Sequence, residues 1–250
     1  MCSSDLAPVG VPAQYDQLVD QWWDPDGGFA MLQWLAAARA DRVPVAARPG
    51  AVLVDLACGG GLMAPHVALL GYRHVGVDIG LAGLRLAREH GVTPVRGSVL
   101  AVPLADGCAD VVLAGEILEH VADPGAVVGE AARLLRPGGT LVIDSIARTR
   151  LAPLVAVTLA ERMPGGPPPG IHDPALFVDR AALRAAAAAH GLELRLVGLR
   201  PSVRDLVAWR RGRRAGVRMR EMPWTGVLFA GWATSPVGRR TTGSARTVGA

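Results

Sequence analysis

Two glutamates and a histidine stand at a spacing that could support chemistry. Glu116, Glu119 and His120 are three and four positions apart, so a helical turn would place all three on one side. Two carboxylates and an imidazole can hold a hard divalent cation, or they can act as a general acid and base. The same residues also suit an ordinary helix start, where a glutamate is favourable and a histidine caps the helix or enters the core. Both interpretations stay open on these residues alone.

A second candidate site lies in the stretch AVLVDLACGGG, residues 51–61. Its first four residues are apolar, rich in β-branched side chains and too few for a helix, which predicts a buried strand. Asp55 follows, and then Cys58 and the glycines Gly59–Gly61 allow a sharp turn that comes close to a ligand. The apolar helical pattern of Leu62–Leu70 comes next. Backbone N–H groups of the turn and of the helix N-terminus would face the bound molecule.

The chemistry of this loop separates two kinds of ligand. Gly59, Gly61 and Ala64 fit a dinucleotide fingerprint, and Asp78 lies about where such a site places its ribose-binding acid. Asp55 argues against a dinucleotide, because a carboxylate inside the loop would repel a pyrophosphate but would bind a cation or an amine. The loop therefore favours a ligand with a cationic amino-acid end and no phosphate.

Strands and helices alternate along the chain and must position both candidate sites. Apolar runs predict seven strands, at Ala51–Val54, His74–Ile79, Val92–Gly97, Ala109–Gly115, Thr140–Ser145, Leu192–Leu199 and Val227–Ala233. Helical patterns cover Tyr15–Trp23, Phe29–Ala38, Leu62–Leu70, Leu81–His90, Pro124–Leu135, Leu151–Met163 and Arg180–His190. Arg136–Gly139 predicts a tight turn. The order predicts an α/β, Rossmann-like fold with a seven-stranded, mostly parallel sheet and helices on both faces. Both candidate sites then follow strands at the carboxyl edge, where open α/β folds bind ligands.

Length and charge bound the organisation of the chain. Its 250 residues carry a formal charge of +4, and all 26 basic residues are arginine. Residues 200–220 hold eight of these arginines against one acid, Asp205, so the basic character is local. The expected organisation is a disordered N-terminus over 1–11, a single domain over 12–234 with a helical cap at 12–45 and an Arg-rich insert at 200–220, and a disordered tail over 235–250.

Several functional classes are disfavoured by composition. No apolar run reaches the length of a transmembrane helix, and the N-terminus lacks the charged and apolar regions of a signal peptide. The three cysteines, Cys2, Cys58 and Cys108, have no metal or disulfide spacing, which fits the cytoplasm. No nucleic-acid motif accompanies the arginines, so we expect no nucleic-acid partner.

Three tryptophans precede the glycine loop. Trp22, Trp23 and Trp34 place a large aromatic area ahead of it. They form either a capping mini-core or a lid over the substrate, and the sequence leaves both open.

The glycine loop resembles the first motif of the class I S-adenosylmethionine (SAM) dependent methyltransferases, D-x-G-x-G. Here the motif reads Asp55-Leu-Ala57-Cys-Gly59, so Ala57 replaces a glycine and disfavours the positive φ that glycine tolerates. The resemblance implies that SAM is the cofactor, that Asp78 accepts hydrogen bonds from the ribose hydroxyls and that Ser98 and Val99 meet the adenine. The implied cofactor-binding residues are Asp55, Ala57, Cys58, Gly59, Gly61, Asp78, Ile79, Ser98, Val99 and Gly115.

A narrower resemblance is to the ubiquinone-biosynthesis O-methyltransferase family, which methylates catechols on polyprenylated rings. It spans about residues 15–200, and the matching stretches are residues 22–27, 55–61, 116–124, 136–139 and 170–173. In that family the E-x-x-E-H motif is associated with magnesium, which implies a Mg²⁺ site at Glu116, Glu119 and His120. A metal there would lower the pKa of a catechol hydroxyl. Without a metal, Glu116 or His120 would take the proton, and His172 and Asp173 are further catalytic candidates.

The resemblance thus implies a SAM-dependent O-methyltransferase acting on a hydroxyl of a lipophilic aromatic acceptor, such as a catechol or a polyprenyl-quinol-like molecule. Alternatives are a methyltransferase of a specialised metabolite or other small molecule, a nicotinamide-dependent oxidoreductase and a non-catalytic SAM-binding module. Asp55 and the E-x-x-E-H turn disfavour the oxidoreductase, and Ala57 is the one feature that favours the non-catalytic module.

Two segments bear on the membrane. Leu151–Met163 aligns with a segment that helps this family meet the membrane, and residues 200–220 would attract anionic lipid. The two segments predict peripheral contact at the inner face of the membrane. The alternatives are a buried lid or core helix for Leu151–Met163 and a solvated basic face for residues 200–220.

Overall fold

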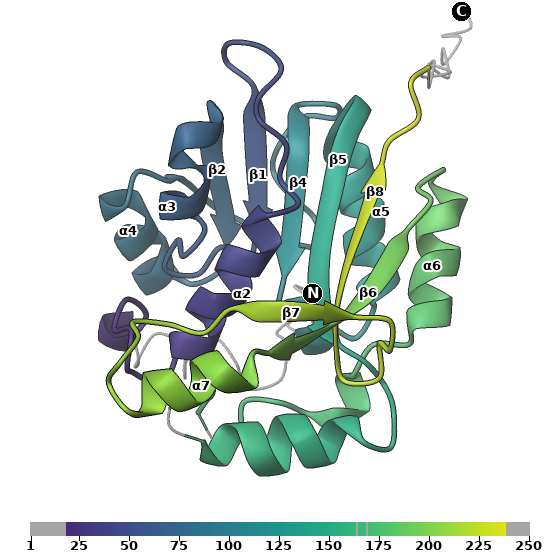
Figure 1. Cartoon of the computed structure of the whole chain (residues 1–250). Coiled ribbons are helices and arrows are strands. Elements are labelled where there is room, and N and C mark those ends of the chain that lie inside the picture. The colour runs from purple at the N-terminus through teal and green to yellow at the C-terminus, as the bar shows by residue number, and fades with distance from the viewer. Residues whose placement is uncertain (1–18, 164, 169, 239–250) are drawn as a thin grey trace, which may run out of the picture.

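One eight-stranded sheet with the order β3-β2-β1-β4-β5-β8-β6-β7 organises the molecule (Figure 1). The computed structural model describes residues 19–163, 165–168 and 170–238. The strands are β1 (Val52–Leu56), β2 (Arg73–Asp78), β3 (Thr93–Arg96), β4 (Ala109–Gly115), β5 (Leu135–Ile146), β6 (Arg195–Pro201), β7 (Met219–Met222) and β8 (Leu228–Thr234). The α-helices are α2 (Ala30–Ala40), α3 (Ala64–Val67), α4 (Leu81–Glu89), α5 (Pro124–Leu134), α6 (Arg180–Ala189) and α7 (Val203–Arg210). The shorter or irregular helices are η1 (Val19–Gln21), η2 (Ala68–Leu70), η3 (Leu118–His120), η4 (Pro153–Leu159), η5 (Ala160–Arg162) and η6 (Pro174–Leu176).

Strand directions determine where the ligand edge lies. β1 is parallel to β2 and β4, and β2 with β3 and β4 with β5 are parallel as well. β8 runs antiparallel to β5 and β6, and β7 runs antiparallel to β6. The predicted α/β, mostly parallel fold is confirmed, with eight strands rather than seven because β7 forms inside the Arg-rich insert. The carboxyl ends of β1, β2, β4 and β5 share one edge, at the bottom of Figure 1.

Helices cover both faces of the sheet because consecutive strand residues point to opposite sides. In β1, Val54 packs on one face together with Val127 of α5 and Leu183 of α6. Its neighbour Leu53 packs on the other face, against residues of α2 such as Ala36. The β1 residues from Leu53 onward are fully or almost fully buried, as expected for a central strand covered on both faces.

The N-terminal segment packs on the sheet and on the glycine loop. The predicted helix Tyr15–Trp23 lies partly outside the described residues, and its described part includes η1. Trp22 stacks on Phe29 with ring centroids 5.1 Å apart. The indole N–H of Trp23 donates to the carbonyl of Gly60 at 3.0 Å. These tryptophans therefore connect the N-terminal segment to the glycine loop and help to hold it in place.

The predicted tight turn at residues 136–139 is wrong. β5 already begins at Leu135, and these residues form its first part, where the pairing with β4 is irregular. Gly138 adopts a φ of 78° and its N–H donates to the carbonyl of Ser235, while the N–H of Ser235 donates to Gly139. Because Ser235, directly after β8, satisfies these backbone groups, residues that are typical of a turn form an irregular start of β5 instead.

The predicted disordered ends fall largely outside the described residues. This applies to residues 1–11 and to residues 239–250 of the predicted tail. Ser235, where that tail was expected to begin, is buried.

The Arg-rich insert folds back onto the N-terminal cap. Residues 200–220 contain α7 and part of β7. Buried Asp205 of α7 accepts a hydrogen bond from the guanidinium of Arg218 at 2.6 Å. Trp209 packs edge-on against Trp34 of α2, with ring centroids 5.0 Å apart. An aromatic contact thus joins two segments about 170 residues apart in sequence.

The predicted helix Leu151–Met163 is not a regular α-helix. It consists of the π-helix η4 and the 3-10 helix η5. Leu154 and Leu159 are about half exposed, whereas Ala156 is buried. Across the part of the chain that the structure describes, no helix is long and apolar enough to cross a membrane.

Candidate active site

The glycine loop after β1 depends on three residues in the left-handed region. Ala57, Gly59 and Gly61 have φ values of 57°, 49° and 79°. A Cβ at Gly59 would lie 2.2 Å from the Trp22 ring, and one at Gly61 would lie 3.0 Å from Ala87 of α4. Both glycines are therefore required by space as well as by φ, whereas Ala57 is held in a conformation that costs an L-residue about 1–2 kcal/mol.

Asp78, at the end of β2, ties this loop to the next one. Its carboxylate accepts the N–H of Gly59 at 2.9 Å and the N–H of Gly80 at 2.7 Å. Burial raises the pKa of Asp78, although the two hydrogen bonds oppose that rise. A carboxylate has about four acceptor positions, so hydroxyl donors can still be accommodated.

The other predicted cofactor contacts lie in the same region. Ile79 follows Asp78 and is partly exposed, and Val99 is buried after β3. The hydroxyl of Ser98 accepts the N–H of Leu100 at 3.2 Å. Cys58 is buried in the turn, and burial raises the pKa of its thiol.

A buried ion pair that the sequence did not reveal stands beside the loop. The guanidinium of Arg39 in α2 bonds the carboxylate of Asp144 in β5 with two contacts, at 2.5 and 2.7 Å. Burial opposes the charge of Arg39, but Asp144 outweighs it and raises the arginine pKa. Gly115 lies directly under the guanidinium, since a Cβ there would be 1.8 Å from the Arg39 Cζ. Position 115, which was predicted to contact the cofactor, must therefore be glycine because the Arg39 side chain approaches its backbone closely.

Asp55 and Glu116 lie close enough to this ion pair to interact with it. Both carboxylates act electrostatically on Arg39. Asp55 is buried, and its Oδ2 lies 3.5 Å from Nε2 of the buried His74. The N–H of Glu116 donates to Asp144 Oδ1 at 3.1 Å. One cationic group therefore organises three acidic side chains at the carboxyl edge.

The two glutamates of the predicted cluster are held in different ways. Glu116 has a φ of 52°, which is unusual for a residue with a side chain. Burial, and then the charges of Glu119 and Asp144, raise the pKa of Glu116 well above its ordinary value. Glu119 is fully buried and accepts the hydroxyl of Ser145 at 2.7 Å. Burial raises the pKa of Glu119 to about 7, although the Ser145 hydrogen bond opposes this rise.

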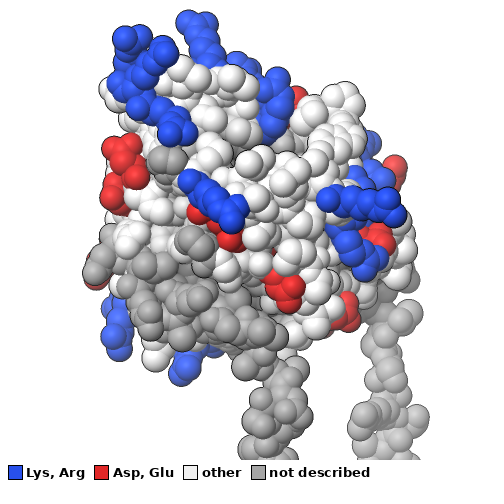
Figure 2. All heavy atoms as spheres, turned by 90° about the horizontal axis from the view of Figure 1, so that it is seen from below, with Lys and Arg blue, Asp and Glu red and all other residues white. Residues whose placement is uncertain are grey.

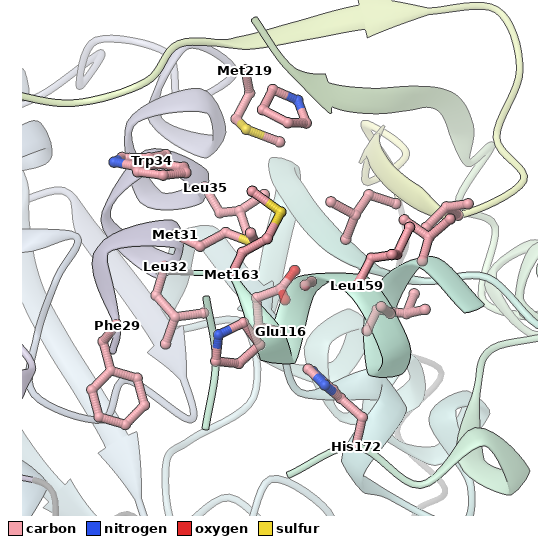
Figure 3. A pocket seen from close by; sticks show the side chains of 18 of the residues that line it. Phe29, Met31, Leu32, Trp34, Leu35, Glu116, Leu159, Met163, His172 and Met219 are labelled. Atoms are coloured by element: carbon pink, nitrogen blue, oxygen red, sulfur yellow. The ribbon is translucent and has the colours of Figure 1, made fainter. Parts of the chain in front are cut away.

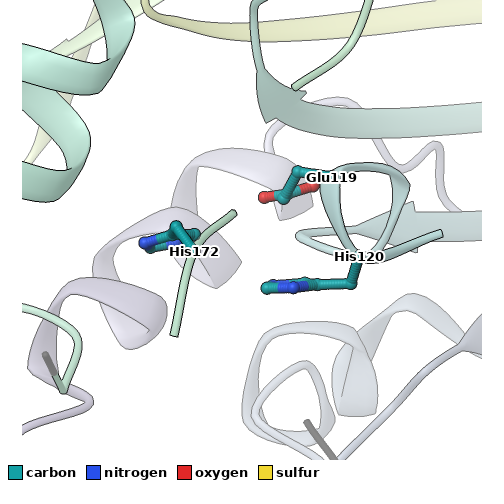
Figure 4. A group of neighbouring side chains, drawn as sticks. All are labelled: Glu119, His120 and His172. Carbon is teal, nitrogen blue, oxygen red and sulfur yellow. The ribbon is translucent and has the colours of Figure 1, made fainter. Parts of the chain in front are cut away.

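A candidate metal-binding group forms here, and it differs by one residue from the three ligands that the sequence predicted. Ligand atoms of Glu119, His120 and His172 lie within 4.8 Å of one another (Figure 4). Their side chains converge from η3 and from the loop before η6. Glu116, which the sequence analysis placed in this set, is not part of the group, and His172 is.

Both imidazoles of this group are held in the neutral form. Burial lowers the pKa of His120 to about 4, and the neighbouring His172 adds to the effect. Burial also lowers the pKa of His172. The two rings stack with centroids 5.7 Å apart. Neutral imidazole is the form that can ligate a metal or accept a proton.

Asp173 does not join this group. Its side chain is exposed, and its Oδ1 accepts the N–H of Ala175 at 2.9 Å, which caps η6. It is also absent from the described pocket lining. The structure therefore gives Asp173 a capping role, which explains an Asp-Pro pair at a helix start.

An apolar pocket opens beside the polar cluster (Figure 3). It holds about 1100 Å³, part of it open to solvent. Its polar end is formed by Glu116, His120 and His172. The apolar walls come from several segments, and they include Phe29, Met31, Leu32, Trp34, Leu35, Val155, Leu159, Met163, Leu206 and Met219. Trp34 thus belongs both to a buried aromatic contact and to a pocket wall.

Strand order, glycine loop and Asp78 together define the class of SAM-dependent methyltransferases. The family model described as "Methyltransferase domain" matches residues 54–143. A SAM-dependent methyltransferase from Thermotoga maritima, described as a possible histamine N-methyltransferase, shares the fold with a TM-score of 0.60 at 18% identity, over 89% of this chain and 98% of that one.

Relatives at higher identity give the family. The ubiquinone biosynthesis O-methyltransferase of Caulobacter vibrioides is 35% identical over 206 residues, which cover 73% of this chain and 80% of that protein. The protein of the same name from Ralstonia nicotianae is 35% identical over 195 residues, covering 75% and 82%. The chain belongs to the ubiquinone biosynthesis O-methyltransferase family and is a SAM-dependent O-methyltransferase. The oxidoreductase alternative is thereby set aside.

Ala57→Gly should stabilise the protein by up to about 1.5 kcal/mol. Relief of the left-handed alanine is worth about 1–2 kcal/mol, and the added freedom of the unfolded chain offsets about 0.4–1 kcal/mol of it. Urea unfolding of both proteins measures the difference. As a control, Ala188→Gly in the exposed part of α6 should destabilise by about 1 kcal/mol. Equal losses in both variants would contradict the strain at Ala57.

Glu119→Gln should remove a decline in stability between about pH 4.5 and 7. With a folded-state pKa of about 7, against an ordinary value of 4.5, Glu119 holds a proton in this window that the unfolded chain has released. The group therefore makes stability fall as pH rises, and glutamine does not titrate. Urea midpoints over this range, in metal-free buffer, give the difference curve. The exposed Glu193→Gln should behave like the parent protein, and a flat difference curve for Glu119→Gln would refute the shift.

Proposed function

We propose that this enzyme methylates a hydroxyl of a lipophilic aromatic acceptor, of the catechol or polyprenyl-quinol type. The observation that carries the proposal is the pocket, in which apolar walls lead to a polar end at Glu116, His120 and His172. Such a pocket matches a molecule with an apolar body and one reactive hydroxyl end. The names of the relatives point to the same kind of acceptor.

The residues around the loop suit SAM. Asp55 supplies negative charge for the amine of its methionine end, and we assign to Arg39, which interacts electrostatically with Asp55, the attraction of the carboxylate of that end. Asp78 offers acceptor positions to the ribose hydroxyls, as the resemblance implied. Ile79, Ser98 and Val99 follow β2 and β3, and we assign them to the adenosine. The three left-handed residues turn the loop sharply after β1, and glycines at two of these positions leave no Cβ between the backbone and a bound ligand.

SAM supplies a methyl group on a positively charged sulfur. The protein must place the acceptor oxygen in line with that methyl and remove the hydroxyl proton. The neutral His120 and His172 and the raised-pKa carboxyls of Glu116 and Glu119 are the candidate groups for holding this proton. The apolar walls exclude water, which strengthens the interaction of these groups with a developing phenolate.

A divalent cation fits the cluster of Glu119, His120 and His172. Glu119 Oε1 has no hydrogen-bond partner among the described residues, and both imidazoles are in the ligating form. Such a cation would lower the pKa of the acceptor hydroxyl. We retain Mg²⁺ from the family motif, but two nitrogen donors and one oxygen suit Mn²⁺ or Zn²⁺ better than Mg²⁺, which prefers oxygen ligands.

We also propose a single domain over residues 12–234, with the cap at 12–45 and the Arg-rich insert at 200–220, located in the cytoplasm. One sheet runs through the described part of this range. Contacts such as Trp34 with Trp209 join the cap to the insert.

Peripheral contact with the inner face of the membrane completes the proposal. Leu154 and Leu159 of η4 and Val203 and Val207 of α7 are exposed apolar side chains on two neighbouring elements at the bottom of Figure 1. Figure 2 shows this face with arginines at its upper and right margins and one near the middle, acidic side chains among them, and uncharged side chains between. Elements η4 and α7 also line the pocket, so a lipophilic acceptor could enter from a bilayer without crossing water.

The purified protein should transfer a labelled methyl from SAM to a catechol carrying a lipophilic tail. The tailed catechol should give a higher kcat/KM than the same ring without its tail, and a ring with both hydroxyls blocked should give no product. We would run the assay with chelator and with added Mg²⁺ or Mn²⁺. Binding of SAM without methylation of any catechol would contradict the acceptor class and leave the cofactor assignment standing.

Asp78→Asn should weaken S-adenosylhomocysteine binding by roughly tenfold to a hundredfold, because a hydrogen bond to a charged group is worth about 1.5–3 kcal/mol. Calorimetry measures this, with thermal unfolding to confirm that the variant folds. The exposed Asp106→Asn is the matched control and should bind as the parent does. Unchanged affinity in Asp78→Asn would remove Asp78 from the cofactor site.

Vesicles of anionic phospholipid should retain the protein, and neutral vesicles should retain less of it. Leu154→Glu combined with Leu159→Glu should weaken retention by roughly tenfold or more per leucine, since each buried leucine contributes about 1.5–3 kcal/mol. Leu69→Glu, also exposed but in η2, is the control. Equal retention of all three proteins would refute contact through this face.

A further inference from the structure

A buried carboxylate holds the histidine at the polar end of the pocket. Glu161 Oε1 lies 3.1 Å from His172 Nδ1, and both side chains are almost completely buried. The other oxygen, Oε2, accepts the N–H of Gly170 at 2.8 Å. No step of the proposed function uses Glu161, and its position in the sequence, eleven residues before His172, gave no signal for the pairing.

The contact determines which nitrogen of His172 carries hydrogen. A carboxylate only accepts hydrogen bonds, so Nδ1 must donate to Glu161. In a neutral imidazole Nε2 then carries the lone pair, on the ring edge away from Glu161. His172 belongs to the ligand group with Glu119 and His120 (Figure 4), and because Nδ1 is engaged by Glu161, Nε2 is the nitrogen left to serve as its ligand atom.

Ring contacts help to hold the plane of His172, in addition to the Glu161 contact that sets its tautomer. His120 stacks on His172 with an interplanar angle of 16°, and Phe177 packs edge-on at 71° from another side. Glu161 itself sits in η5, next to the pocket-lining residue Ala160. The carboxylate therefore couples a wall of the pocket to the loop that carries the histidine.

We propose that Glu161 is the positioning residue of this site: it fixes the Nδ1–H tautomer and the plane of His172, so that Nε2 faces Glu119 and His120 and completes a two-histidine, one-carboxylate cation site. This inference rests on the proposed function, because it concerns the same polar cluster. Carboxylates that hold the second nitrogen of a ligating histidine orient the ring and increase its basicity, and their loss typically costs about 10–100-fold in metal affinity.

Glu161→Gln separates positioning from mere packing. Glutamine has the same shape, and its oxygen can still accept the Gly170 N–H, so the loop stays attached. Its NH₂ group would then donate to His172 Nδ1, which forces the hydrogen onto Nε2 and removes the lone pair from the site. Glu161→Asp keeps an acceptor and should keep the original tautomer, and exposed Glu193→Gln is the matched control.

Two measurements test the proposal. Nitrogen-15 NMR of metal-free protein should show His172 protonated at Nδ1 in the parent and in Glu161→Asp, and at Nε2 in Glu161→Gln. Electron paramagnetic resonance titration with Mn²⁺ should show Glu161→Gln binding about 10–100-fold more weakly than the parent, with Glu193→Gln unchanged. The same tautomer in the parent and in Glu161→Gln, or equal Mn²⁺ affinity, would overturn the proposal.

These readouts do not depend on the acceptor. If the parent protein failed to bind Mn²⁺, the cation site would be refuted, while the NMR result would still decide whether Glu161 sets the tautomer. If no catechol were methylated but the tautomer changed as expected, the proposed acceptor would fail and the role of Glu161 would stand.

Discussion

The buried pair of Arg39 and Asp144 is the interaction on which the arrangement of the site depends. It joins α2, from the N-terminal cap, to the end of β5 in the sheet, across 105 positions of sequence. Taking both charges out of water is costly, and the two short contacts offset that cost only while the geometry is kept. Removing either partner would leave an unpaired buried charge, which typically costs about 3–5 kcal/mol. The pair therefore holds the cap at one position over the carboxyl edge, and the cap supplies one wall of the pocket.

The same pair sets the electrostatics of its surroundings. Arg39 is the positive charge that Asp55 and Glu116 share with Asp144, but one guanidinium cannot neutralise three carboxylates. Burial, with the charge of Asp144 added to it, raises the pKa values of Glu116 and Glu119, so protons on these two carboxyls can relieve part of the negative excess. A cationic methyl donor and a divalent cation both carry the charge that this edge lacks. Negative excess at the carboxyl edge thus favours SAM and would favour the proposed cation, and the apolar pocket beside it keeps that excess from being screened by water.

The sequence predicted what local patterns can encode. The strand before Asp55, the glycine turn and Asp78 follow from residue types within a few positions of one another, and the structure places them as expected. Arg39 and Glu161 could not be found this way, because each becomes significant only through a partner brought near by tertiary folding. The tight turn expected at residues 136–139 failed for a similar reason: hydrogen bonds with Ser235 override the local turn preference. β7 was missed because its four residues, Met-Arg-Glu-Met, include none of the β-branched or aromatic side chains that are typical of strands.

Two non-glycine residues in the left-handed region, Ala57 and Glu116, follow the neighbouring parallel strands β1 and β4. Such residues cost about 1–3 kcal/mol each and persist only where their surroundings over-determine them. Cys58 N–H bonds the carbonyl of Val77 after Ala57, and Asp144 accepts the N–H of Glu116. The turn after β1 is therefore held by a hydrogen bond to β2, and the turn after β4 by a hydrogen bond to β5. The strain turns the chain abruptly at the carboxyl edge, so the glycine loop begins directly after β1, and Glu116, which lines the pocket, stands directly after the neighbouring β4.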